Sequence, residues 1–201
     1  MYTPYLRHQR SSKIAGWFAL VGVFLLSGCA SIMGSVTGGL ASNLSAAILN
    51  SDDPAMIRDG APSYLILIDS LVAGSPDNST LLAQSAELHS AYAGAFVEDP
   101  VRAARLNSKA KAQILRSTCL SLKNACGLES RDFDEFSAWV DAQGPSSVPA
   151  LYNLGSIWAG WIQGNSSDFA AIAQLGRVKA LIQRVADLDP EHANGGAFLY
   201  P

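Results

Sequence analysis

Histidine and cysteine are scarce in this chain, with three of each among 201 residues. Beyond residue 28 the histidines are His89 and His192, which stand on separate predicted elements and have no cysteine or carboxylate at ligand spacing. His89 falls inside an apolar helical pattern, where a hydrogen-bonded packing role is the better interpretation. We therefore expect no metal site and no cofactor.

Motifs that mark catalysis are lacking as well. Gly155-Ser156 has neither the flanking glycine nor the preceding strand of a nucleophile elbow. The carboxylates of Asp132, Asp134 and Glu135 fall in the first turn of a predicted helix, where favourable interaction with the helix dipole accounts for them. We expect no catalytic residues, so the protein is predicted not to be an enzyme.

Positive charge is sparse. Three of the fourteen Lys+Arg residues, namely Arg7, Arg10 and Lys13, lie before residue 28, and none of the seventeen Asp+Glu residues does. The rest of the chain therefore carries 11 basic and 17 acidic residues, a net charge of −6. Such a chain lacks the basic patch that nucleic-acid phosphates require and the polybasic segment that anionic lipids attract. We expect no nucleic-acid partner.

The first thirty residues have the pattern of a bacterial lipoprotein signal. Basic residues precede an apolar run over 14–26, which is short for a membrane span, and the run ends in Leu26-Ser27-Gly28-Cys29. In the lipobox pattern a peptidase cuts before the cysteine, which takes a diacylglyceryl group. An uncleaved anchor with an incidental cysteine is the weaker alternative. We predict a signal peptide over 1–28, lipidation at Cys29 and a flexible tether over 29–39.

This signal also predicts a location. The mature chain is expected to face the periplasm and to contact the membrane through its lipid anchor. By resemblance to lipoprotein sorting in Gram-negative bacteria, Ala30 in place of aspartate after the lipidated cysteine favours the outer membrane.

Residues 40–201 are predicted to form one all-α domain. Apolar residues recur at intervals of three and four, and no segment alternates as a strand does. Asp53-Pro54 and Asp99-Pro100 have the form of an N-cap followed by a first-turn proline, and Pro62 is expected to open a further helix that Gly74 closes. The predicted helices cover 62–73, 80–96, 100–122, 132–142, 149–163 and 175–188, with a short segment at 169–174.

Repeated spacings refine this picture. Two segments have the four, three and five spacing of the second helix of a tetratricopeptide repeat: Tyr64, Ile68, Leu71 and Pro76, and Val178, Ile182, Val185 and Pro190. The first-helix half appears at Leu151-x-x-Leu154-Gly155-x-x-Trp158, where Gly155 would let the paired helix approach closely. Because the halves are irregularly spaced, we predict a degenerate tetratricopeptide-like array of antiparallel helical hairpins.

Cys119 and Cys126 flank a predicted helix end. Export places them in an oxidising compartment, and they can meet if the helix stops between them. A disulfide closing this short loop would add about 2 to 3 kcal/mol of stability on the loop-entropy model. Two free core thiols are the alternative, and a redox-active pair is a weaker one because the spacing is not Cys-x-x-Cys.

Aromatic residues are few but clustered: Tyr92 and Phe96 lie on one predicted helix, and Tyr152, Trp158 and Trp161 lie on another. Trp158 and Trp161 are three apart and share a helix face. Core packing is the ordinary role of such side chains. The alternative is that a set of aromatics and one amide lines a concave or channel surface suited to an apolar ligand with a polar end. The candidates are Tyr64, Tyr92, Asn153, Trp158 and Trp161.

Several segments together carry a family resemblance. They are Asp53-Pro54 leading to Arg58-Asp59-Gly60-Ala61-Pro62, the 64–71 helix, Ser90-Ala91-Tyr92-Ala93-Gly94-Ala95-Phe96, Asp132-Phe133-Asp134-Glu135-Phe136, Leu151-Tyr152-Asn153-Leu154-Gly155 with Trp158 and Trp161, and Leu188-Asp189-Pro190. On these residues the chain resembles the TRAP transporter TatT component family over nearly the whole mature chain.

The resemblance implies a periplasmic lipoprotein with an all-helical, tetratricopeptide-like fold. It implies association with the substrate-binding protein of a tripartite ATP-independent periplasmic (TRAP) transporter, and a homotrimer with a channel through each protomer. The family usually continues through further helices, whereas this chain stops at Gly195-Gly196-Ala197-Phe198-Leu199-Tyr200-Pro201. We therefore expect an array that is incomplete at its carboxyl end.

Two functions are compatible with a lipid anchor and helical hairpins. The first is an accessory binding module of a TRAP system that docks the substrate-binding protein and accepts a ligand. The second is a tetratricopeptide-type envelope scaffold in outer-membrane or cell-wall assembly. Only the family resemblance favours the first.

Overall fold

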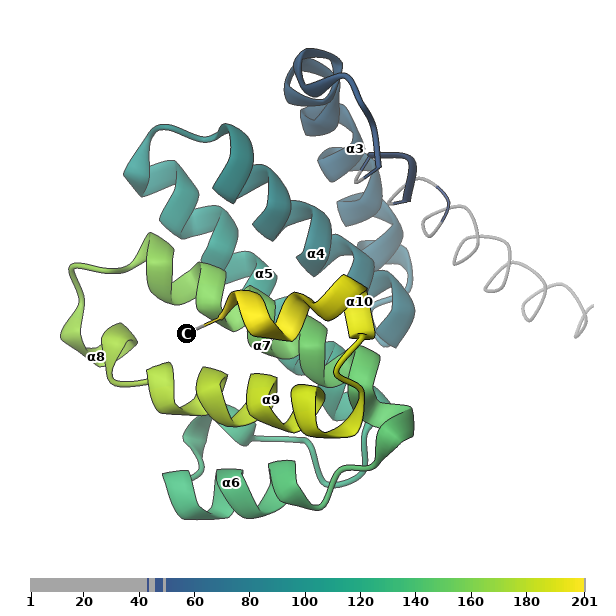
Figure 1. Cartoon of the computed structure of the whole chain (residues 1–201). Helices are drawn as coiled ribbons and strands as arrows, with labels where there is room; N and C mark the ends of the chain where they lie inside the picture. Colours follow the sequence, from purple (N-terminus) through teal and green to yellow (C-terminus); the bar gives the residue numbers. More distant parts are fainter. Residues whose placement is uncertain (1–42, 44–45, 49, 201) are drawn as a thin grey trace, which may run out of the picture. The chain divides into compact units, whose positions relative to one another are not determined.

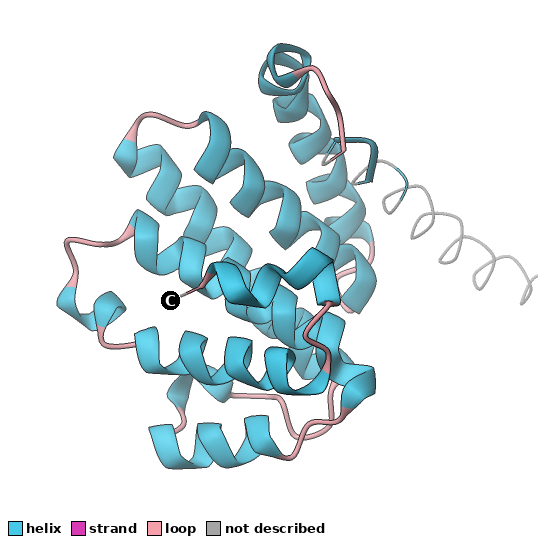
Figure 2. Cartoon of the chain, viewed as in Figure 1, coloured by secondary structure: helices cyan, strands magenta, loops and turns pink. Residues whose placement is uncertain are grey.

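The computed structural model describes residues 43, 46–48 and 50–200. The predicted signal peptide, the lipidated Cys29 and the tether lie outside these residues. The described part consists of helices joined by short loops and contains no strand (Figure 2). The prediction of an all-α fold is confirmed. None of the described helices is both long and apolar enough to cross a membrane.

In the described part of the chain, six helices of nine residues or more form the array, and short helical turns lie between them. The longer helices are α3 (Pro54–Gly74), α4 (Ser79–Phe96), α5 (Pro100–Ser121), α6 (Phe133–Asp141), α7 (Val148–Gly164) and α9 (Leu175–Leu188). The short ones are η1 (Leu128–Ser130), η2 (Pro145–Ser147), α8 (Phe169–Ile172), α10 (His192–Gly195) and η3 (Gly196–Leu199). Within the described residues, α3 packs on α4, α4 on α5, α5 on α7 and α7 on α9, while α6 covers α9 (Figure 1).

Side-chain caps set where these helices begin. The Asp53 carboxylate accepts a hydrogen bond from the Met56 backbone N–H, and the Asp99 carboxylate accepts one from Val101. Asp132 caps α6 in the same way through the Glu135 N–H. Each cap satisfies a backbone donor that the helix itself leaves unpaired. The predicted starts at Pro54 and Pro100 are therefore confirmed.

The prediction that Pro62 opens a helix is wrong, because α3 runs unbroken through it. Proline has no N–H to donate to the carbonyl four residues earlier, which is that of Arg58. The Tyr92 hydroxyl of α4 lies 3.5 Å from the Arg58 carbonyl oxygen and donates to it instead. Tyr92 is 7% exposed, so tertiary packing supplies the hydrogen bond that the helix loses.

Because the Tyr92 hydroxyl replaces the N–H that Pro62 lacks, the effects of mutating Tyr92 and Pro62 on stability should be coupled. Pro62→Ala restores a backbone N–H for the Arg58 carbonyl, so the Tyr92 hydroxyl becomes redundant. Tyr92→Phe should cost about 1 kcal/mol of unfolding free energy in the native sequence and clearly less in the Pro62→Ala background. Urea denaturation of the four proteins of this double-mutant cycle measures the difference. An equal cost in both backgrounds contradicts the assignment.

Gly155 lies where α7 and α9 cross. A Cβ atom at Gly155 would lie 2.8 Å from Ile182 Cδ1 and 3.3 Å from Leu181 Cβ. The segment predicted as a first helix of a repeat thus packs on the segment predicted as a second helix. The close approach that the sequence assigned to Gly155 is confirmed by this contact.

The buried side chains form two clusters. The larger one joins α5, α6, α7 and α9 and includes Ile114, Phe136, Leu154, Trp158 and Leu181. The smaller one lies between α3 and α4 and includes Leu65, Ile68, Leu81, Leu88 and Tyr92. α3 is therefore held mainly by α4, which leaves its other side uncovered within the described part of the chain.

Candidate functional site

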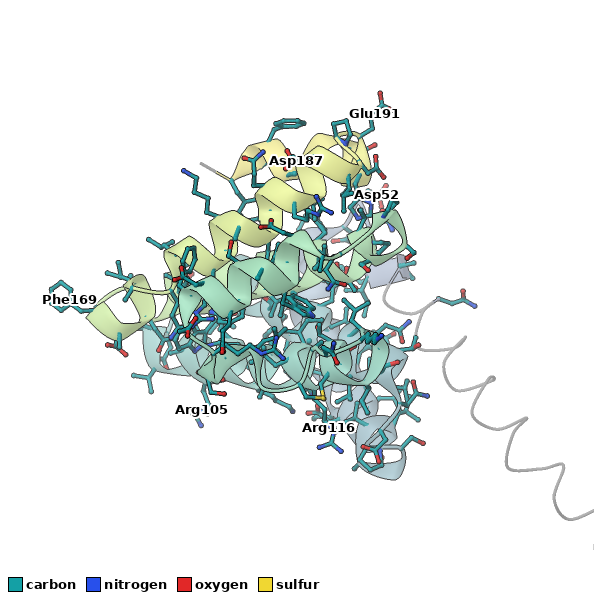
Figure 3. The ribbon with its side chains drawn as sticks, turned by 90° about the horizontal axis from the view of Figure 1, so that it is seen from below. Asp52, Arg105, Arg116, Phe169, Asp187 and Glu191 are labelled. Atoms are coloured by element: carbon teal, nitrogen blue, oxygen red, sulfur yellow. A yellow bond between two sulfur atoms is a disulfide. The ribbon has the colours of Figure 1, made fainter. Side chains whose placement is uncertain are left out.

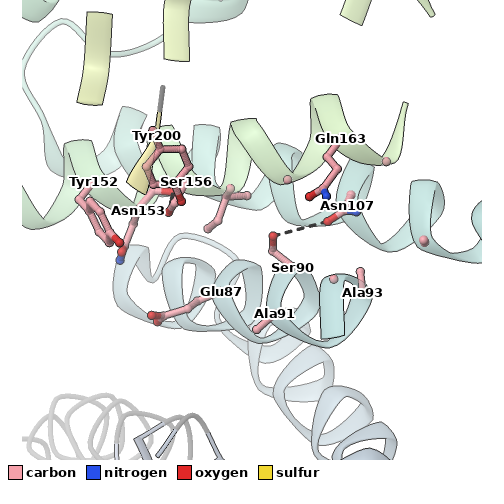
Figure 4. A pocket seen from close by; sticks show the side chains of 15 residues that line it. Glu87, Ser90, Ala91, Ala93, Asn107, Tyr152, Asn153, Ser156, Gln163 and Tyr200 are labelled. Carbon is pink, nitrogen blue, oxygen red and sulfur yellow. Dashed lines mark hydrogen bonds between the residues drawn. The ribbon is translucent and has the colours of Figure 1, made fainter. Parts of the chain in front are cut away.

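A groove of about 500 Å³ opens between α4, α5 and α7 (Figure 4). α5 contributes Ala103 and Asn107. The residues from α4 are Glu87, Ser90, Ala91, Ala93 and Gly94, and those from α7 are Tyr152, Asn153, Ser156, Ile157, Gly160, Gln163 and Gly164. Tyr200, which follows η3, completes the lining. The volume lies within the range that small-molecule sites usually have. We call this cavity the α4–α7 groove.

Small side chains create one end of the groove. Ser90, Ala93 and Gly94 of α4 face Gly160 and Gly164 of α7. A Cβ atom at Gly160 would lie 2.9 Å from the Ser90 Oγ, and one at Gly164 would lie 2.8 Å from the Asn107 Nδ2. The two glycines therefore let the three helices approach closely, and the Ser90 hydroxyl and the Asn107 amide remain in contact between them.

The other end of the groove carries two tyrosines. Tyr152 and Asn153 project from α7 on the side toward which Glu87 reaches from α4 (Figure 4). Gly196 permits the carboxyl-terminal segment to cover Tyr152, because a Cβ atom at Gly196 would overlap the Tyr152 hydroxyl. Burial raises the pKa of the Tyr200 hydroxyl, as does Tyr152, whereas a hydrogen bond with Ser156 lowers it.

The polar groups of the groove are hydroxyls, amides and one carboxyl. The buried Asn107 accepts a hydrogen bond from the Ser90 hydroxyl at 3.5 Å through its Oδ1. Among the described residues of the lining, Glu87 is the one carboxyl, and none is a lysine, arginine or histidine. Burial raises the pKa of Glu87 above its ordinary value. The described lining is therefore partly polar and carries no positive charge.

The structure does not bring the five predicted ligand candidates together. Asn153 lines the α4–α7 groove. Tyr92 instead lines a separate apolar cavity of about 220 Å³ between α3 and α4, together with Leu65, Leu88 and Phe96. Tyr64 is 39% exposed on the outer side of α3. The sequence pattern could not show this, because each of these helices turns a different face to its neighbours.

Trp158 belongs to the core, which corrects the hypothesis that it lines a ligand surface. Its side chain is fully buried, and its ring meets that of Phe136 edge to face with centroids 5.9 Å apart. The indole Nε1 donates to Gln174 Oε1 at 2.8 Å. A fully buried indole with its N–H satisfied has no surface left for a ligand.

Trp161 covers a buried lysine. The Lys111 Nζ lies 3.5 Å from the Trp161 ring centroid and 4.8 Å from that of Trp158. It donates to Glu129 Oε1 at 2.6 Å and to Gln174 Oε1 at 3.0 Å. Burial lowers the pKa of Lys111, and the Glu129 carboxylate opposes that effect. Trp161 is therefore part of a structural cation–π contact and does not line the groove.

His89 has the packing role that the sequence indicated. It is buried on α4, and its Nδ1 lies 2.8 Å from the Ser85 carbonyl oxygen, to which the N–H tautomer donates. Its Nε2 lies 3.6 Å from the Asp69 carboxylate, which also pairs with Lys109. Burial lowers the pKa of His89. Over residues 43, 46–48 and 50–200, no three His, Cys, Asp or Glu side chains form a group that could hold a metal ion.

Cys119 and Cys126 lie at the end of α5, where the helix gives way to a loop. The structure places them as a disulfide with Cα atoms 4.3 Å apart and a sequence separation of 7. The helix ends at Ser121, between the two cysteines. The pair borders no part of the α4–α7 groove.

Sequence reasoning missed most of the groove. Glu87, Asn107, Gly160 and Tyr200 were not singled out as site residues, although all four line it. One signal was present: Ser156, Gly160 and Gly164 recur at intervals of four and form a small-residue stripe on one helix face. That stripe marks a close approach, but it does not reveal which helices approach.

The fold and the cavity together define a class of all-helical array proteins with a groove of small-molecule size. Within this class, comparison of sequences identifies the family. The family model described as TRAP transporter T-component matches residues 50–200, so the chain belongs to that family. No curated protein and no solved structure matches the chain significantly. The family assignment makes the protein an accessory component of a TRAP transport system.

Proposed function

We propose that this protein is a lipid-anchored periplasmic accessory component that docks the substrate-binding protein of its TRAP transporter and accepts a ligand in the α4–α7 groove. The observation that carries the proposal is the groove itself, in a chain whose match to the T-component family spans nearly all described residues. It is about 500 Å³ in volume and combines apolar walls with convergent hydroxyl and amide groups, the composition expected of a small-molecule site. Catalysis is not expected of it.

The outer side of α3 supplies a docking surface for the partner. Met56, Tyr64 and Leu67 are spaced by eight and three, so they share one helix face. They are 59%, 39% and 43% exposed. Exposed apolar side chains gathered on one helix face are typical of protein interaction sites. We call this set the α3 face.

The docking proposal predicts that polar substitutions on the α3 face weaken partner binding without unfolding the protein. In Tyr64→Ser/Leu67→Ser, affinity for the purified substrate-binding protein should fall by about tenfold or more, because two exposed anchors are lost while the core is untouched. Biolayer interferometry with the full-length tagged chain measures the affinity. Circular dichroism melts check that the fold is retained.

Phe169→Ser is the matched control. Phe169 projects from α8 and is 86% exposed, but it lies on a different element from the α3 face (Figure 3). Its replacement should leave the affinity unchanged. Equal losses in both variants contradict docking through the α3 face. If the native protein binds envelope-assembly factors and no substrate-binding protein, the scaffold function replaces the transport one.

The anchoring proposal predicts a processing defect. Cys29 supplies the thiol for lipidation in the lipobox pattern, so Cys29→Ser should accumulate as an unprocessed precursor that labelled palmitate does not mark. Gel mobility and palmitate labelling measure this, and Cys119→Ser/Cys126→Ser should mature and label normally. Maturation of Cys29→Ser contradicts the lipobox interpretation.

Location and oligomeric state are tested on the native protein. Fractionation into the inner membrane contradicts the outer-membrane location. A monomeric mass by light scattering contradicts the homotrimer that the resemblance implies.

A further inference from the structure

The groove has an electrostatic character that the family assignment does not address. In the part of the chain that the structure describes, its lining includes the carboxyl of Glu87 and no cationic side chain. Over the described residues, Glu87 makes neither a hydrogen bond nor an ion pair within the usual distance limits. A carboxylate that is partly removed from water and has no partner attracts a positive charge and repels a negative one.

Nearby cations of α5 are engaged elsewhere. The Arg102 guanidinium lies 5.7 Å from the ring centroid of Tyr92, and Tyr92 does not line the groove. Lys109 pairs with Asp69, and Lys111 pairs with Glu129. None of these three side chains lines the groove, so the described residues provide no counter-ion at this position.

Two tyrosine rings lie in the same lining as the carboxyl. Tyr152 comes from α7 and Tyr200 from the segment after η3, and both lie at the end of the groove toward which Glu87 reaches (Figure 4). The Tyr152 ring is held in place by an edge-to-face contact with His192, with centroids 5.2 Å apart. Aromatic faces combined with a carboxylate are the groups that recognise ammonium ions.

We propose that the α4–α7 groove binds a small organic cation, whose ammonium group lies between the Glu87 carboxylate and the rings of Tyr152 and Tyr200. The amides of Asn153 and Asn107 and the hydroxyls of Ser90 and Ser156 then receive the polar atoms of the rest of the ligand. An organic anion is disfavoured, because it would meet Glu87 without a compensating cation. This inference rests on the proposed role of the groove as a ligand site and names the chemical class of the ligand.

Three probes of nearly the same shape isolate the charge. Choline carries a quaternary ammonium, 3,3-dimethylbutan-1-ol replaces that ammonium by a neutral tert-butyl group, and 3,3-dimethylbutanoate carries a negative charge. Isothermal titration calorimetry of the full-length chain in a maltoside detergent measures each affinity. Choline should bind about tenfold tighter than the neutral alcohol, and the alcohol should bind tighter than the carboxylate.

Glu87→Gln tests the residue. It keeps the size of the side chain and removes its charge, so choline and the neutral alcohol should then bind equally, with the affinity of the alcohol itself little changed. Glu98→Gln is the matched control, since Glu98 is exposed beyond the end of α4 and does not line the groove. It should keep the preference for choline.

The inference is overturned if the native protein shows no preference for choline, if the preference persists in Glu87→Gln, or if none of the three probes binds. The substrate-binding-protein assay is independent of these results. A protein that docks its partner but shows no choline preference contradicts the ligand class alone. A protein that prefers choline but docks no such partner contradicts the transport role alone.

Discussion

Trp158→Ala should lower the free energy of unfolding by about 3 to 5 kcal/mol, the usual cost of truncating a fully buried tryptophan. The substitution removes the edge-to-face contact with Phe136 and leaves the Gln174 Oε1 without the indole donor. It also removes one of the two rings over Lys111. Urea denaturation followed by circular dichroism measures the loss.

Trp161→Ala is the matched comparison, because the two tryptophans lie one turn apart on α7. Trp161 is only partly buried, and its indole N–H donates to the hydroxyl of Ser108, itself an exposed residue. Its removal should cost about 1 to 2 kcal/mol, mostly from the lost cation–π contact with Lys111. Equal costs for the two variants contradict the division into a core and a covering tryptophan.

Gly155→Leu should destabilise the protein by about 1 to 3 kcal/mol or more through overpacking. Even a single Cβ atom at this position would lie 2.8 Å from Ile182 and 3.3 Å from Leu181. A leucine therefore has to push α7 away from α9, and these two helices carry much of the larger core. Chemical denaturation measures the loss, and binding of the substrate-binding protein should fall with the folded fraction.

Gly94→Leu controls for the removal of a helical glycine. Gly94 lies inside α4, and a Cβ atom there meets no other atom within 4 Å. Because leucine favours the helix over glycine, this variant should keep or slightly raise stability, by up to about 1 kcal/mol. If Gly94→Leu and Gly155→Leu are equally destabilised, close helix approach is not the reason for the glycine at 155.

Local sequence determined where most helices begin and end. Asp53, Asp99 and Asp132 each accept a backbone hydrogen bond within three residues of themselves, so their capping role depends on neighbouring sequence alone. The three-and-four apolar spacing gave α4, α5, α7 and α9 to within a few residues. The close helix approach at Gly155 was also predictable from the sequence, because a glycine on an otherwise apolar helix face indicates close packing whichever helix is the partner.

Tertiary structure decided what local sequence could not. Pro62 lies inside α3 because Tyr92, thirty residues further along the chain, donates to the Arg58 carbonyl that proline leaves free. Trp158 and Trp161 lie on the same helix, yet only Trp158 is enclosed by α6 and the segment that carries Gln174.

The groove shows most clearly which features depend on local sequence and which depend on tertiary structure. The sequence by itself determined the helices and the small residues of α7, because helix period and capping are properties of neighbouring residues. It did not determine that Glu87 of α4, Asn107 of α5 and Tyr152 of α7 share one cavity. That juxtaposition depends on which faces three separate helices turn toward one another, and only their packing in the folded chain fixes it.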